Sequence, residues 1–133
     1  MSGLGTTQDT TQLHAAAVAE TYTGGHITMG VSKDSSSIKG QFIVIIFVLP
    51  EGISTPSLNV GDNQDILQPE EYVLWSRAFH FGDVADGEYA ISISDRIKTQ
   101  RKLKVGDRIS IAGLASVASL ANVYCAITSF YKQ

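Results

Sequence analysis

Alternating apolar side chains between Glu88 and Ala112 constrain the fold of this chain more than any other feature. Apolar residues take odd positions along this stretch, at Tyr89, Ile91, Ile93, Ile97, Leu103, Val105, Ile109 and Ile111. A period of two residues is typical of a β-strand with one buried face and not of a helix. Val105, Gly106 and Asp107 interrupt the pattern. Because Gly and Asp accept a positive φ, we predict a turn there that joins two antiparallel strands.

The same stretch holds most of the positive charge. Six of the ten Lys and Arg residues lie between positions 96 and 108: Arg96, Lys98, Arg101, Lys102, Lys104 and Arg108. Residues 96–133 carry a net charge of +6, whereas residues 1–95 carry −9. Such a distribution can present a basic face to nucleic acid or to an acidic part of a neighbouring subunit. The alternative is a solvated charged edge that discourages unwanted strand pairing. We take the six cations as candidate nucleic-acid or interface contacts.

Other segments predict further strands. Residues 26–31, 72–81 and 122–131 alternate or are rich in β-branched and aromatic residues. Gln41–Leu49 is apolar on both faces, so it is either the central strand or a strand covered by a partner subunit. Residues 12–22 fit a short helix or a strand, and we interpret them as a strand. Six or seven strands without a helix indicate an all-β fold, an antiparallel sandwich or a closed barrel.

Large aromatic residues alternate in the strand predicted at 72–81. Trp75, Phe79 and Phe81 share one face with Val73, and Arg77 intrudes among them. Aromatic side chains bury large apolar areas, so this spacing predicts that Trp75, Phe79 and Phe81 anchor the core or a packed interface.

Length and composition narrow the class of protein. A chain of 133 residues fits one domain. No apolar run approaches the roughly 18 residues needed to cross a bilayer, and the N-terminus lacks the layout of a signal peptide, so no membrane partner is expected. The single cysteine, Cys125, excludes an internal disulfide, and its apolar surroundings in the sequence predict a small buried side chain.

No motif for catalysis, cofactor binding or metal binding is present. The sequence has no nucleophile elbow, P-loop or dinucleotide fingerprint. Asp62 and Asp65 lack the length and closing glutamate of a calcium loop. Glu70 and Glu71 are adjacent, so in a strand they would point to opposite faces and would not share acid–base work. We therefore expect no enzyme activity, no cofactor and no metal site.

Several stretches in fixed order resemble the coat proteins of small viruses with circular single-stranded DNA genomes. They are TGGHI (Thr23–Ile27), VLPEG (Val48–Gly52), ILQPEEYVLWS (Ile66–Ser76), RKLKVGDRI (Arg101–Ile109) and ITSFYKQ (Ile127–Gln133). The resemblance implies a jelly roll of about seven or eight strands over residues 23–133. It also implies a capsid subunit that assembles with copies of itself, 60 or a multiple, into an icosahedral virion around nucleic acid. Such a subunit is made in the host cytosol or nucleus.

The N-terminal region departs from this family. Its coat proteins begin with a long arginine-rich arm, whereas residues 1–22 contain no Lys or Arg. Either the basic strand replaces the arm, or the subunit packages nucleic acid weakly, or it assembles beside another protein. We expect residues 1–22 to be flexible or ordered by a partner. The alternative function is a stand-alone β-barrel module that binds nucleic acid or another polyanion.

Overall fold

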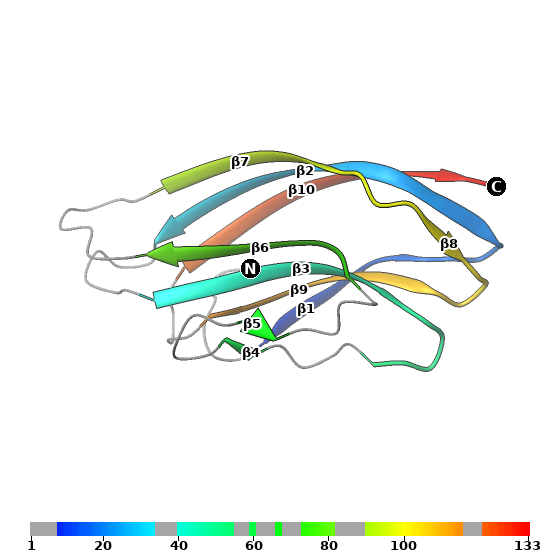
Figure 1. Ribbon diagram of the computed structural model, residues 1–133, viewed down its shortest axis with the longest axis horizontal. Helices are drawn as coiled ribbons and strands as arrows, with labels where there is room; N and C mark the ends of the chain where they lie inside the picture. Colours follow the sequence, from blue (N-terminus) through cyan, green and yellow to red (C-terminus); the bar gives the residue numbers. More distant parts are fainter. Residues whose placement is uncertain are drawn as a thin grey trace.

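The computed structural model describes residues 8–33, 40–54, 59–60, 66–67, 73–81, 90–115 and 121–133. This part of the chain consists of strands and their connections (Figure 1). The strands are β1 (Asp9–Ala15), β2 (Glu20–Lys33), β3 (Gly40–Leu49), β4 (Asn59–Val60), β5 (Ile66–Leu67), β6 (Val73–Phe81), β7 (Ala90–Ile97), β8 (Arg101–Leu103), β9 (Arg108–Ala115) and β10 (Ala121–Lys132). The described residues include no helix long and apolar enough to span a bilayer.

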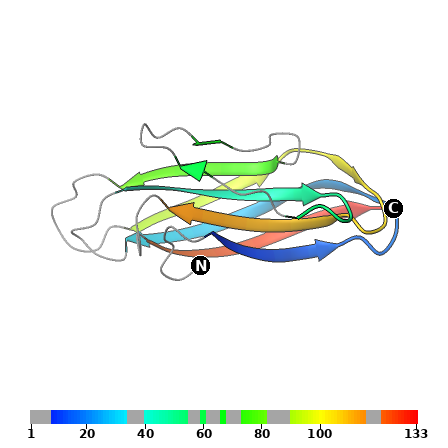
Figure 2. The same ribbon diagram turned by 90° about the horizontal axis from the view of Figure 1, so that it is seen from below.

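Eight of these strands form two antiparallel sheets that pack face to face (Figures 1 and 2). The first sheet has the order β1-β9-β3-β6. The second has the order β10-β2-β7, with β8 pairing β2 beyond the end of β7. The short strands β4 and β5 pair only with each other, and β4 contacts β3 and β9. The prediction of an all-β antiparallel sandwich is therefore confirmed.

The strand β3 is the centre of the first sheet, and nine of its ten residues are buried. Its even positions, from Phe42 to Val48, face the core between the two sheets. Its odd positions, from Ile43 to Leu49, form a second buried cluster with Ala112 and Leu114 of β9. The uninterrupted apolar run of β3 thus reflects a strand that is covered on both faces within the same chain.

Burial alternates from Ile93 to Lys104 as predicted, but β9 is buried on both faces, and the stretch from Glu88 to Ala112 does not form one hairpin. The turn exists, with Gly106 at φ 94°, and it is fixed by the Lys104 backbone N–H donating to Asp107 Oδ2 (2.9 Å). However, β8 pairs with β2 in the second sheet, whereas β9 pairs with β1 and β3 in the first. Leu103 and Ile109 both enter the core between the two sheets, so the strands that carry them face each other across it.

Residues 9–22 belong to the sandwich and are not a separate segment. Asp9–Ala15 pairs with β9, and a turn at residues 16–19 leads into β2. This turn is tied to the next one, because the Gly106 N–H donates to the Ala16 carbonyl and the Ala16 N–H donates to the Asp107 carbonyl, both at 2.9 Å. The sandwich therefore includes residues 9–22, which the prediction placed outside it, while residues 1–7 lie outside the described part.

Trp75 is buried in the core, as its spacing predicts, and is only 8% exposed. Phe79 and Phe81 lie in β6, but their side chains are outside the described set, so their predicted core role stays a prediction. Asp62, Asp65, Glu70 and Glu71 also lie outside the described residues.

Candidate functional site

The outer face of the second sheet gathers most of the predicted contact residues. Along β7, β8 and the residues that follow each, Arg96, Lys98, Lys102 and Lys104 are exposed, while Ile97 and Leu103 between them are buried. Because successive side chains of a strand point to opposite faces, these cations lie on the outer face and the apolar residues between them lie in the core. From β10 comes a further cation, Lys132, which lies with Lys102 on either side of Thr21 in the strand register. We call these five residues the basic face.

Two of the six predicted cations lie elsewhere. Arg101 is half-buried. It lies two residues before Leu103 in β8, so its side chain points to the same, inward face of the strand. Arg108 begins β9 in the other sheet, where its guanidinium donates to the carbonyl oxygens of Pro50 (3.2 Å) and Ile53. Arg108 thus stabilises the turn after β3. The odd position of Arg101 among cations at even positions already separates it in the sequence, whereas the place of Arg108 depends on the connection between β8 and β9.

The described carboxylates near the basic face form hydrogen bonds within the sandwich or at its edge. Glu20 Oε1 lies 2.5 Å from Nε2 of His14 in β1, within hydrogen-bond distance. Asp95 accepts a hydrogen bond from Trp75 Nε1 (2.8 Å) and one from the Arg96 backbone N–H (2.8 Å). Both hydrogen bonds lower the pKa of Asp95, and the bond from Trp75 has the larger effect. Within the described part of the chain, the five cations of the basic face have no ion-pair partner.

A shallow hollow of about 280 Å³ lies beside Arg96 and Lys98. Its lining residues are Thr23, Gly24, Gly25, Arg96, Ile97, Lys98, Gln100 and Phe130. Gly24 has a φ of 131°, and a Cβ on it would lie 2.9 Å from the Ile97 carbonyl oxygen. Both facts restrict this position to glycine. We call this feature the glycine hollow.

Phe130 supplies the aromatic side of the glycine hollow. It lies on β10, opposite Gly24 in the strand register, and is 57% exposed. The basic stretch itself contains no aromatic residue among its cations. Sequence reasoning missed Phe130 as a site residue, because it lies more than thirty positions from Arg96 and only the pairing of β10 and β7 with β2 brings the two together.

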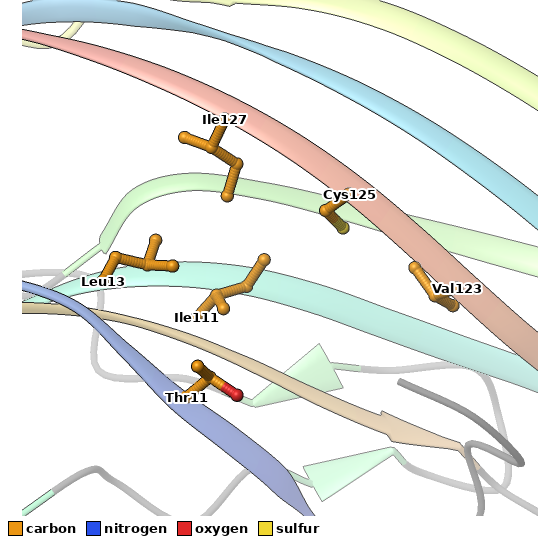
Figure 3. A pocket seen from close by; sticks show the side chains of 6 residues that line it. All are labelled: Thr11, Leu13, Ile111, Val123, Cys125 and Ile127. Atoms are coloured by element: carbon orange, nitrogen blue, oxygen red, sulfur yellow. The ribbon is translucent and has the colours of Figure 1, made fainter.

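A second surface feature lies at the side of the sandwich where β1 and β10 are the edge strands. A cleft of about 290 Å³ opens there between the sheets, lined by Thr11, Leu13, Ile111, Val123, Cys125 and Ile127 (Figure 3). A neighbouring hollow of about 250 Å³ shares Leu13 and Ile127 and continues to the stacked rings of His14 and Tyr131. We call this continuous feature the edge cleft.

Cys125 is exposed in the edge cleft, which corrects the expectation of a buried thiol. Cys125 lies two residues after the buried Val123, so its side chain points to the same, inward face of β10. However, β10 is the edge strand of its sheet, and no described residue covers the thiol at that edge. Desolvation by the apolar surroundings raises the pKa of Cys125, so the thiol stays protonated at neutral pH.

The described residues contain no group of three or more His, Cys, Asp or Glu side chains that could hold a metal ion. Comparisons with protein-family models, with curated proteins and with solved structures found no match.

Proposed function

We propose that this protein is a capsid subunit that assembles with copies of itself into an icosahedral shell enclosing a nucleic-acid genome. The observation that carries the proposal is the edge cleft. Within the described part of the chain, β1 and β10 are each paired on one side only, and the cleft between them holds Leu13, which is 40% exposed, and the exposed Cys125. Free strand edges next to apolar surface favour pairing with another chain. Closed symmetry repeats such a contact until no free edge remains.

The rigidity of the sandwich supports the proposal, because a closed shell is built from rigid subunits. The two sheets share one core, and the turns at residues 16–19 and 104–107 are tied together by backbone hydrogen bonds at one end. The first sheet interleaves strands from the beginning, middle and end of the chain, in the order β1-β9-β3-β6. Interleaving of this kind is a property of the jelly rolls that build viral shells, and it is in line with the sequence resemblance over residues 23–133.

The basic face supports the second part of the proposal, contact with the genome. Five exposed cations without a described ion-pair partner would bind phosphates. The same face favours the second candidate function, a stand-alone β-sandwich module that binds nucleic acid or another polyanion. Assembly separates the two functions, because only the capsid subunit forms a large closed particle.

The test is the mass of the purified protein by sedimentation velocity and light scattering, with the ultraviolet spectrum recorded on the same peak. We expect a particle of ~60 subunits or a multiple, with an absorbance that includes nucleic acid. A monomer or dimer at all protein concentrations and salts would overturn the capsid proposal and leave the binding module.

A charge in the edge cleft tests the surface that carries the proposal. Leu13 is 40% exposed on β1, so Leu13→Glu leaves the core in place and introduces a carboxylate between the free edges. We expect this variant to stay folded but small. The control is Val18→Glu, at a similarly exposed apolar residue (45%) outside the cleft, which should still assemble. Equal assembly of both variants would show that the cleft is not an interface.

A further inference from the structure

The glycine hollow combines the two groups that bind a single-stranded nucleotide. Exposed cations on one side can contact a phosphate, and an exposed aromatic ring on the other can stack on a base. We infer that the hollow is a subsite for single-stranded nucleic acid, in which Phe130 stacks on a base while Arg96 and Lys98 contact the flanking phosphates. The inference rests on the nucleic-acid part of the proposed function and names how that contact is made.

The strand register sets the width of the subsite. Phe130 lies on β10 and Lys98 follows β7, with only β2 between them, so two strand spacings of about 4.8 Å separate the aromatic from the cationic side. The floor of this gap is Gly24 and Gly25. A Cβ on Gly24 would meet the Ile97 carbonyl oxygen, and one on Gly25 would meet the Thr128 carbonyl oxygen and the Tyr22 hydroxyl, so close packing within the sheet restricts the floor to glycine.

Polar groups in the hollow extend the match to a nucleotide. Gln100 can donate to and accept from a base edge or a sugar hydroxyl, and the Thr23 hydroxyl donates to the Phe130 carbonyl oxygen (3.1 Å), which ties the aromatic strand to the floor. The hollow is partly open to solvent, so an unpaired base can enter it. A duplex keeps its bases stacked inside and offers Phe130 no face to bind.

The experiment measures binding of the full-length protein to a fluorescein-labelled twelve-residue oligothymidylate by fluorescence anisotropy across a salt series. For Phe130→Ala we expect about tenfold weaker binding at every salt concentration, since loss of one stacked base costs a factor of about this size. The slope of log affinity against log salt should not change. For the double variant Arg96→Ala with Lys98→Ala, we expect the slope to fall by about 1.4, corresponding to two phosphate contacts on a single strand.

Matched controls separate the hollow from general charge and apolar exposure. Tyr124→Ala removes another exposed aromatic of β10 (66% exposed) outside the hollow, and it should bind like the unaltered protein. Arg77→Ala removes an exposed cation from the other sheet, and it should leave the salt slope unchanged. Emission from the single, buried Trp75 reports that each variant is folded.

Two further oligonucleotides test whether the hollow binds an unpaired base. An abasic oligonucleotide of the same length should bind the unaltered protein about as weakly as oligothymidylate binds Phe130→Ala. A duplex of equal length should bind more weakly than the single strand. Equal binding of Phe130→Ala and Tyr124→Ala, or tighter binding of the duplex, would overturn the inference. Assembly is measured separately, so the two proposals can fail independently. If the protein forms a particle but Phe130→Ala binds oligothymidylate as tightly as the unaltered protein, only the subsite is refuted. If the protein is a monomer and Phe130→Ala shows the full loss of affinity, only the shell is refuted.

Discussion

The two sides of the sandwich are closed to different degrees. At the side where β6 lies over β7, hydrogen bonds connect the sheets: Trp75 Nε1–H donates to Asp95 Oδ2 (2.8 Å), and the Thr99 hydroxyl donates to the Leu74 carbonyl oxygen (3.2 Å). At the side where β1 lies over β10, the edge cleft separates Leu13 from Cys125 and Ile127. Facing sheets lie about 10 Å apart. A long side chain with a polar end, such as Trp75, spans that gap, whereas the short apolar residues of the edge cleft do not.

Each sheet ends in an edge strand at both sides of the sandwich, so the sides differ in how the two sheets are joined and not in the presence of an edge. At the closed side, where β6 and β7 are the edge strands, hydrogen bonds join the two sheets. At the open side, where β1 and β10 are the edge strands, Leu13 is 40% exposed and Cys125 is exposed. Substitutions at the two sides should therefore have unequal effects on the stability of the single chain.

Removal of Trp75 should have the largest effect. Trp75→Ala deletes a buried aromatic and the hydrogen bond to Asp95, so the free energy of unfolding should fall by about 3–5 kcal/mol. Leu13→Ala, at the open side, should cost about 1 kcal/mol because its side chain is 40% exposed. Urea unfolding followed by circular dichroism measures both values. Equal losses would mean that the two sides are equally closed.

Thr99→Val tests the second bond of the closed side. The substitution keeps the shape of the side chain but leaves the Leu74 carbonyl without its donor, and it should cost about 1 kcal/mol. Thr11→Val, at the rim of the edge cleft, is the matched control and should be close to neutral, because Thr11 is exposed. The same urea titrations apply, and a destabilised Thr11→Val would contradict the open state of the cleft.

Asp95 should make the closed side sensitive to acid. The hydrogen bonds from Trp75 and from the Arg96 N–H lower its pKa, so the contribution is fully present above the usual carboxyl pKa of about 3.9 and is lost as the pH falls through the lowered value. The effect should be smaller than that of Thr99→Val, since solvent reaches the carboxylate. In Asp95→Asn, the fall of the urea midpoint below about pH 4 should be shallower; an unchanged pH profile would contradict this role.

Cys125→Ser should have the smallest effect on stability, within about 0.5 kcal/mol, because the thiol is exposed. The informative measurement is thiol labelling with Ellman's reagent. The native subunit should react without unfolding, and its rate should keep rising with pH beyond the range of an ordinary thiol because the pKa is raised. Assembled particles should protect the thiol. A native subunit that reacts only after denaturation would mean that the cleft is closed.

The class of fold and the positions of several strands follow from the sequence alone. Period-two patterns predicted strands at β6, β7 and β10, because burial of alternate side chains is a local property of an extended chain. The apolar run of 41–49 predicted a strand covered on both faces, and the structure shows that the cover comes from the same chain. The turn at Gly106 was also predictable from its residue types.

The partners of each strand, in contrast, follow from contacts between distant parts of the chain. Local pattern does not say whether a turn joins neighbours in one sheet or crosses between two, so the predicted hairpin became a connection between sheets, and Arg108 was separated from the basic face. The same long-range pairing made β10 an edge strand, which exposes Cys125, and set Phe130 across β2 from Arg96 and Lys98. Neighbours within a sheet are fixed by hydrogen bonds and core burial between residues far apart in the chain, and no local spacing encodes them.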